Sequence, residues 1–115
     1  MSSFQDLDVY RRASELFPRI YRMVRSWPKD DQRELGSQLI RAANSIHANI
    51  AEGWSKSVAD FKRYTGTSLG SCDEVQSHLT DAYNVGFTEK KLYEDLRKEY
   101  EIVGKQLNKL KQNWK

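Results

Sequence analysis

The sequence is poor in cysteine, proline and glycine, which number one, two and six among its 115 residues. The single cysteine, Cys72, has no partner for a disulfide within the chain, so the fold must rest on a packed core. Prolines and glycines interrupt regular structure, and their scarcity favours a few long elements. No apolar run approaches the roughly 20 residues that a membrane-spanning helix needs, so we expect no membrane insertion.

The chain also lacks an apparent export signal, because its opening residues, MSSFQDLDVY, have neither a basic start nor an apolar run. The lack of an export signal, together with the single cysteine, favours location of the protein in a reducing cytoplasm. A length of 115 residues predicts a single domain, residues 1–115, and 38% hydrophobic with 30% charged residues is typical of a soluble globular protein. The net charge of +3 is mild and compatible with an acidic partner.

What the sequence does contain is apolar residues at three- and four-residue steps, the spacing of one face of an α-helix. The pattern predicts four helices, at about Asp6–Ser26, Pro28–Gly53, Ser57–Gly86 and Thr88 to the C-terminus, with Ser57 and Thr88 as N-caps. Pro18 lies inside the first helix, where we expect a kink. Connections of a few residues make neighbouring helices antiparallel, so we predict an all-α, up-down-up-down antiparallel four-helix bundle.

Polar residues flank the predicted core face of the second and third helices. At about 100° per residue they form a stripe on each helix, and the two stripes are expected to meet. The members of this group are Arg41, Ser45, Asn49, Glu52, Ser71 and Glu74. We interpret them as a structural polar network or subunit contact, in which Arg41 pairs with Glu52 or Glu74; a ligand or catalytic pocket is the alternative. Because a buried polar group without its partner is destabilising, loss of one member should weaken the fold.

Two motifs carry a family resemblance. One is RAANSIHANIAEG, residues 41–53, and the other contains Gly70, Ser71 and Glu74. Further matches are Phe4-Gln5-Asp6-Leu7, Trp27-Pro28 and Gln38. On these residues, most of the chain resembles the four-helix-bundle proteins called 23S rRNA intervening-sequence proteins. It departs from their pattern at Pro18, His47 and Cys72.

The resemblance implies an antiparallel four-helix bundle that assembles as a homopentamer and is encoded, in some bacteria, by inserts within ribosomal RNA genes. It implies no defined activity. A more distant similarity to the accessory variability proteins of retroelements implies nucleic acid or a reverse transcriptase as the partner. Fold alone does not carry function, so this partner is an analogy.

The titratable residues do not form a catalytic or metal-binding pattern. A carboxylate-bridged metal bundle needs Glu-x-x-His pairs, whereas Glu74 and His78 are four residues apart. His47 and His78 lie on different predicted helices without zinc-type spacing. Cys72 falls on an apolar face, which favours a buried, inert thiol. We therefore expect no catalytic residue, no metal and no cofactor.

Basic residues form the second candidate site. The fourth predicted helix carries a stripe of lysines, and no acidic residue follows Glu101. The candidate residues for nucleic-acid contact are Lys91, Lys98, Lys105, Lys109, Arg11, Arg22 and Arg25. These side chains suit phosphate groups, of RNA or DNA, although lysines on an outer helix face are often simply solvated. Tyr93, Tyr100 and Trp114 offer rings for base stacking, with core or interface packing as the alternative for Tyr100 and Trp114.

Aromatic residues make up 11% of the chain, a large apolar load for one small bundle. On the fourth predicted helix, Tyr93 and Tyr100 widen the apolar band beyond what one core requires, which predicts packing between subunits. The sequence therefore predicts a non-enzymatic, self-associating bundle that binds structured nucleic acid or a nucleic-acid enzyme. A protein-interaction scaffold without a nucleic-acid role is the alternative, and an enzyme ranks third.

Overall fold

The computed structural model describes residues 3–115, and every regular element in that range is helical. The long helices are α1 (Asp8–Arg25), α3 (Ser37–Gly53), α4 (Val58–Asn84) and α5 (Lys90–Asn113). The short elements are a 3-10 turn, η1 (Phe4–Asp6), the single turn α2 (Lys29–Asp31) and a π-helical turn, η2 (Gln32–Gly36). No helix within residues 3–115 is long and apolar enough to cross a membrane.

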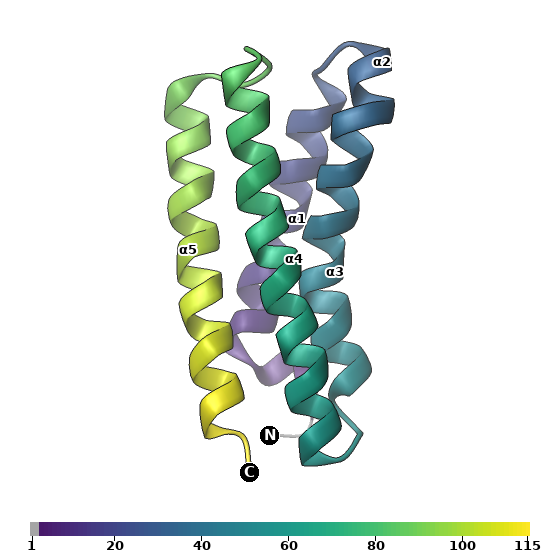
Figure 1. Ribbon diagram of the computed structural model, residues 1–115, viewed down its shortest axis with the longest axis vertical. Coiled ribbons are helices and arrows are strands. Elements are labelled where there is room, and N and C mark those ends of the chain that lie inside the picture. The colour runs from purple at the N-terminus through teal and green to yellow at the C-terminus, as the bar shows by residue number, and fades with distance from the viewer. Residues whose placement is uncertain (1–2) are drawn as a thin grey trace.

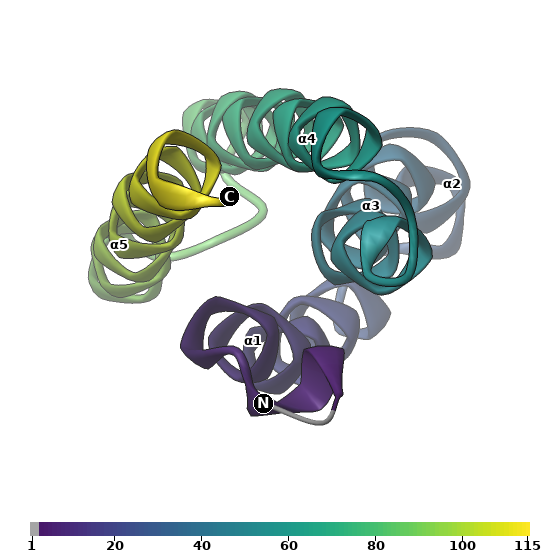
Figure 2. The same ribbon diagram turned by 90° about the horizontal axis from the view of Figure 1, so that it is seen from below.

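The four long helices pack side by side as a bundle 44 × 23 × 20 Å in extent, which confirms the predicted four-helix fold. Figure 1 shows them running alternately up and down, with the start of α1 and the end of α5 at the bottom of the view. Seen from below, the order around the bundle is α1, α3, α4 and α5 (Figure 2). Helix α4 therefore lies between α3 and α5, and the first and last long helices face each other.

Helix α1 begins two residues later than predicted because a separate 3-10 turn precedes it. Ser3 caps that turn: its Oγ accepts the Gln5 amide proton at 3.1 Å, and the Ser3 amide donates to the Asp6 carboxylate at 3.2 Å. Pro18 is exposed inside α1, which continues through it without a break. The predicted kink at Pro18 thus stays a prediction.

The second predicted helix is interrupted near its start. A π-helical turn separates α2 from α3, at the point where Gly36 is buried against the end of α1. A Cβ at Gly36 would lie 2.5 Å from Val24 Cγ1, so only glycine allows this approach. The Gln32 side chain also donates to the Trp27 carbonyl oxygen at 2.6 Å, which ties the turn to the preceding loop. A π-helical turn holds one more residue than an α-helical turn.

Of the N-caps predicted for the last two helices, Ser57 is confirmed and Thr88 is wrong. Ser57 caps α4 as expected, because its Oγ accepts the Asp60 amide proton at 3.2 Å. Thr88 does not cap α5, and the N-cap residue is Glu89. Thr88 is instead buried, with its hydroxyl 3.1 Å from Met23 Sδ. Packing of this loop against α1 therefore overrides the local capping preference.

Most of the aromatic side chains lie in the core or pack against it while partly exposed. Tyr100 is completely buried, and Tyr93 stacks on Tyr83 of α4 with ring centroids 4.6 Å apart. Trp114 stacks on Phe61 at 4.3 Å. Tyr100 is therefore not available to a neighbouring subunit, whereas Tyr93 is only partly buried and its predicted subunit contact stays a prediction. Both rings find their partners within one bundle, where α5 packs against α4.

Candidate functional site

Three of the six predicted network residues are hydrogen-bonded to one another at the interface of α3 and α4. Ser71 Oγ on α4 donates to Ser45 Oγ on α3 at 2.7 Å. Asn49 Nδ2 donates to the same Ser45 hydroxyl at 2.9 Å and to the Ser45 carbonyl at 2.8 Å. One turn away, the buried Ser68 hydroxyl donates to the Ile46 carbonyl at 2.7 Å. The polar residues of this pair of helices thus connect the two backbones directly.

The charged members of the predicted network do not join it. Arg41 bonds only to Ser37 of its own helix, at 3.4 Å from Nε to the carbonyl and 3.3 Å from Nη2 to the hydroxyl. Glu52 lies 4.0 Å from Lys56. Eleven residues separate Arg41 from Glu52, which is roughly 16 Å along a helix and too far for pairing. The expected ion pair of Arg41 with Glu52 or Glu74 is therefore absent from the described interactions.

Four of the six residues nevertheless surround one open groove between α3 and α4, with a volume of about 320 Å³. The side chains that line it are Gln38, Arg41, Ala42, Ser45, Ser71, Glu74 and His78. Arg41 and Glu74 are exposed, whereas Ser71 is buried. Asn49 and Glu52 lie outside the groove lining. We refer to this feature as the α3–α4 groove.

The lysine stripe of α5 is exposed along its whole length, but its members differ in their pairing. Lys91 lies 3.6 Å from Asp95. Within residues 3–115, Lys98, Lys105 and Lys109 form no ion pair. Ile102, 39% exposed, lies among them at helical spacing. The C-terminal half of α5 therefore presents uncompensated positive charge around one exposed apolar side chain.

The three predicted arginines of α1 lie near the two ends of that helix. Because α1 and α5 run in opposite directions, Arg11 lies at the end of the bundle where α5 finishes, and Arg22 and Arg25 lie where α5 begins (Figure 1). Arg11 pairs with Asp8, and Arg25 donates to the Tyr21 hydroxyl at 3.0 Å. The predicted basic residues are thus divided between the two ends of the molecule.

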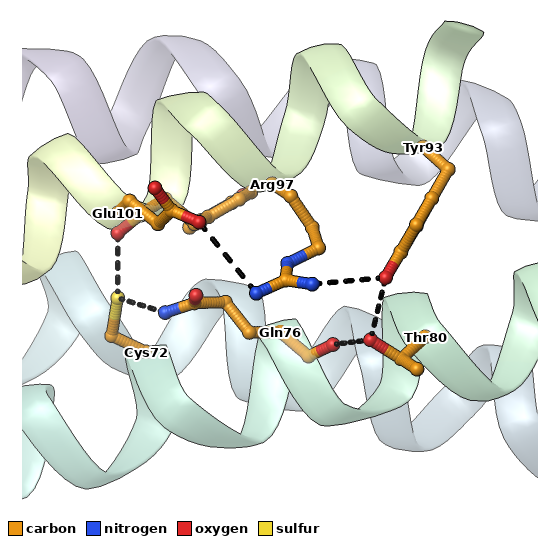
Figure 3. A network of polar contacts seen from close by, with 7 residues as sticks. Cys72, Gln76, Thr80, Tyr93, Arg97 and Glu101 are labelled. Atoms are coloured by element: carbon orange, nitrogen blue, oxygen red, sulfur yellow. Dashed lines mark hydrogen bonds and ion pairs between the residues drawn. The ribbon is translucent and has the colours of Figure 1, made fainter. Parts of the chain in front are cut away.

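A chain of polar contacts that we did not predict from the sequence joins α4 and α5 (Figure 3). The Tyr93 hydroxyl lies 3.1 Å from the Thr80 hydroxyl and accepts a proton from Arg97 Nη1 at 3.1 Å. Arg97 also lies 3.6 Å from Glu101. These hydrogen bonds, that of Thr80 first, lower the pKa of Tyr93. On each helix these residues are four positions apart. In the sequence, polar residues at this spacing are indistinguishable from those of an ordinary solvent-exposed helix face.

Cys72 lies at the other end of this chain of contacts. Its thiol donates to the Tyr100 carbonyl at 3.2 Å and accepts a weak bond from Gln76 Nε2 at 3.8 Å. Burial, and secondarily the charge of Asp73, raises the pKa of the Cys72 thiol to about 11. The thiol is therefore protonated near neutral pH, and protonated thiols are poor nucleophiles. The prediction that Cys72 is buried is confirmed.

His47 faces α1, with its ring 5.8 Å from both Tyr10 and Phe17. Its Nδ1 is buried without a hydrogen-bond partner in the described part of the chain. Burial lowers the pKa of His47, because the charged imidazolium is poorly solvated there. This histidine thus packs as a nearly apolar ring.

The chain can now be compared with known proteins. A model of the 23S rRNA-intervening sequence protein family matches residues 5–109. The chain belongs to this family. A crystal structure of a protein from the S23 ribosomal protein family of Bacteroides thetaiotaomicron, described as having unknown function, superposes with a TM-score of 0.84 at 22% identity. The match covers 91% of this chain and 96% of that one, and it shows a shared fold. No curated protein gives a match.

The protein has no cluster of three or more His, Cys, Asp or Glu side chains, within residues 3–115, that could hold a metal ion. His78 and the serines Ser45 and Ser71 line the same groove, yet no hydrogen bond joins the imidazole to either hydroxyl in that range. A serine nucleophile needs a base within hydrogen-bond reach. Within residues 3–115, neither groove hydroxyl therefore has the imidazole as a hydrogen-bonded base.

Proposed function

We propose that this protein is a non-enzymatic, self-associating helical bundle that binds structured nucleic acid, or an enzyme that acts on nucleic acid, in the cytoplasm. One observation carries the proposal: Lys98, Lys105 and Lys109 lie exposed on one face of α5, without a carboxylate partner in residues 3–115. Lysines that are free of ion pairs release counterions when they meet phosphates, which drives association. The family's description, which refers to 23S rRNA, supports RNA as the first partner to test.

Self-association is supported by the exposed apolar side chains. Tyr21 is 42% exposed, Val58 42%, Val85 61% and Ile102 39%. Ile102 is central to the proposal, since it lies within the lysine stripe, where apolar contact and charge can act together. Repetition of a weak phosphate-binding face in an assembly would raise its overall affinity without new contacts. The family resemblance favours a pentamer.

A non-enzymatic role is supported by the state of the reactive side chains. The Cys72 thiol is buried and its pKa is raised to about 11. His47 packs among aromatic rings, and His78 has no hydrogen bond to a hydroxyl in the described residues. Within residues 3–115, neither Cys72 nor a groove serine is therefore held against a histidine base, an arrangement that covalent catalysis often uses.

The proposal is tested by fluorescence anisotropy of a labelled structured RNA across a salt series. Log affinity should fall linearly with log salt, by about 0.7 to 0.9 for each phosphate contact. The double variant Lys98→Ala/Lys105→Ala should bind more weakly and show a smaller slope. Lys90→Ala is the matched control, because Lys90 lies on the same helix, 3.8 Å from Glu94.

Absence of RNA and DNA binding at low salt would overturn the nucleic-acid part of the proposal. The same result would favour the alternative, a protein-interaction scaffold, because the exposed apolar side chains remain to be explained. If the double variant binds as tightly as the unmodified protein, the nucleic acid contacts a surface other than the outer face of α5.

A further inference from the structure

The α3–α4 groove contains opposite charges that face each other without pairing. The bond between Ser45 and Ser71 sets the register of the two helices. Helices α3 and α4 run in opposite directions (Figure 1). Arg41 precedes Ser45 by one turn on α3, and Glu74 follows Ser71 by one turn on α4. The two charged residues therefore lie opposite each other across the groove. A further turn brings Gln38 opposite His78. The groove thus has a hydroxyl level, a charged level and an amide–imidazole level.

Hydrogen-bond capacity is left over at the hydroxyl level. Ser45 Oγ accepts protons from both Ser71 Oγ and Asn49 Nδ2. Each serine hydroxyl carries one proton, and the hydrogen bond between them uses the proton of Ser71. The other proton has no acceptor among the described residues, and both serines line the groove. A ligand oxygen in the groove would satisfy it.

The charged level offers one site for an anion and one for a cation. Arg41 uses two of its nitrogens, both on Ser37 and both at long distances of 3.3 and 3.4 Å, so most of its donors are free. A guanidinium prefers a carboxylate that takes two parallel bonds. Glu74 is exposed and has no hydrogen bond or ion pair within residues 3–115. Its carboxylate is available to an ammonium group.

We propose that the α3–α4 groove binds a free polar α-amino acid, with its carboxylate on Arg41 and the serine hydroxyl and its ammonium group on Glu74. The third level, Gln38 and His78, faces the side chain and favours a polar one. A volume of about 320 Å³ is at the small end for ligand sites and accommodates a molecule of this size. This site is on another pair of helices from the α1 and α5 faces proposed for nucleic acid.

The first experiment is isothermal titration of the full-length protein with each of the twenty L-amino acids, with L-glutamine as the leading probe. We expect saturable binding of polar members. N-acetyl-L-glutamine lacks the ammonium charge and L-glutaminamide lacks the carboxylate, so each should bind at least tenfold more weakly than L-glutamine. The His78 ring signals in an NMR spectrum should shift during the titration, which locates the ligand in the groove.

Two variants test the assignment of the charges. Arg41→Gln and Glu74→Gln replace exposed side chains, so the fold should persist, and each should weaken L-glutamine binding at least tenfold. Arg41→Gln should also bind L-glutamine and L-glutaminamide equally well. The controls Arg33→Gln and Glu52→Gln change the same charges outside the groove and should leave the affinity unchanged.

Three outcomes would overturn the inference: no saturable binding by any of the twenty amino acids, equal binding of the blocked analogues, or full affinity in Glu74→Gln. Any of these would leave Arg41 and Glu74 as solvated charges. RNA anisotropy of Arg41→Gln should match that of the unmodified protein. Failure of this site is thereby distinguished from failure of the nucleic-acid proposal.

Discussion

At the scale of single residues, burial decides what each side chain can do. His47 and Cys72 are chemically reactive types, but α3 and α4 bring both against packed neighbours. The pKa of His47 is lowered and that of Cys72 is raised, and in both cases burial disfavours the charged form. The position of Cys72 on a predicted apolar face indicated this environment in advance, because the periodicity of apolar residues reports burial.

The lowered pKa of His47 predicts a pH dependence of stability. The unfolded chain binds a proton at this histidine near its ordinary pKa of 6.5, whereas the folded chain does so only at lower pH. Stability is therefore fully present above pH 6.5 and falls as the pH drops below it. Urea midpoints at pH 7.5 and 5.5 should differ less in His47→Gln than in the unmodified protein. His78→Gln is the matched control; an equal pH response in His47→Gln would contradict the prediction.

Two glycines should respond to alanine substitution with opposite sign. Gly70 lies exposed within α4, and a Cβ there would have no neighbour within 4 Å. Gly70→Ala should therefore raise the free energy of unfolding by about 1 kcal/mol, the difference in helix propensity. Gly36→Ala should lower it, because of the 2.5 Å approach to Val24. Thermal unfolding measures both, and destabilisation by Gly70→Ala would show that α4 has another partner at that point.

At the scale of elements, α3 and α4 are joined by small polar side chains rather than by ion pairs. Asn49→Ala removes the two bonds to Ser45 and should lower the free energy of unfolding by about 1 kcal/mol. Glu52→Ala removes an exposed charge and should change it by less than about 0.5 kcal/mol. Chemical denaturation compares the two. Equal effects would mean that the hydrogen bonds of Asn49 contribute nothing to the helix pair.

Element boundaries show where local sequence preferences were overruled. Ser57 caps α4 as its type and spacing predict, since its hydroxyl has no other partner among the described residues. Thr88 has an equally suitable side chain, but it is buried against Met23 and Glu89 takes the cap position. The π-helical turn before α3 likewise arises from contact of Gly36 with α1, which no local pattern reports.

At the scale of the whole molecule, one exposed apolar side chain, Ile102, lies on α5 among lysines that form no ion pair within residues 3–115. We expect the protein to be larger than a monomer at micromolar concentration, by analytical ultracentrifugation. Ile102→Glu should lower the assembled mass because it places a charge in the contact, while thermal stability stays nearly the same, since Ile102 is 39% exposed. An unmodified protein that is monomeric under these conditions would contradict self-association, and an unchanged mass in the variant would place the interface elsewhere.

The sequence by itself determined the helices, their order and the face that each one buries, because a repeat of 3.6 residues places apolar side chains on one side whatever the partner. It also predicted the joining of Ser45, Asn49 and Ser71. Only the tertiary structure decided which charges meet. Arg41 and Glu74, which were predicted as possible partners, line the same groove but form no ion pair within residues 3–115. The predicted basic residues are divided so that each end of the bundle holds some from α1 and some from α5. Such pairings depend on the register and direction of neighbouring helices, which the packing of the whole core sets.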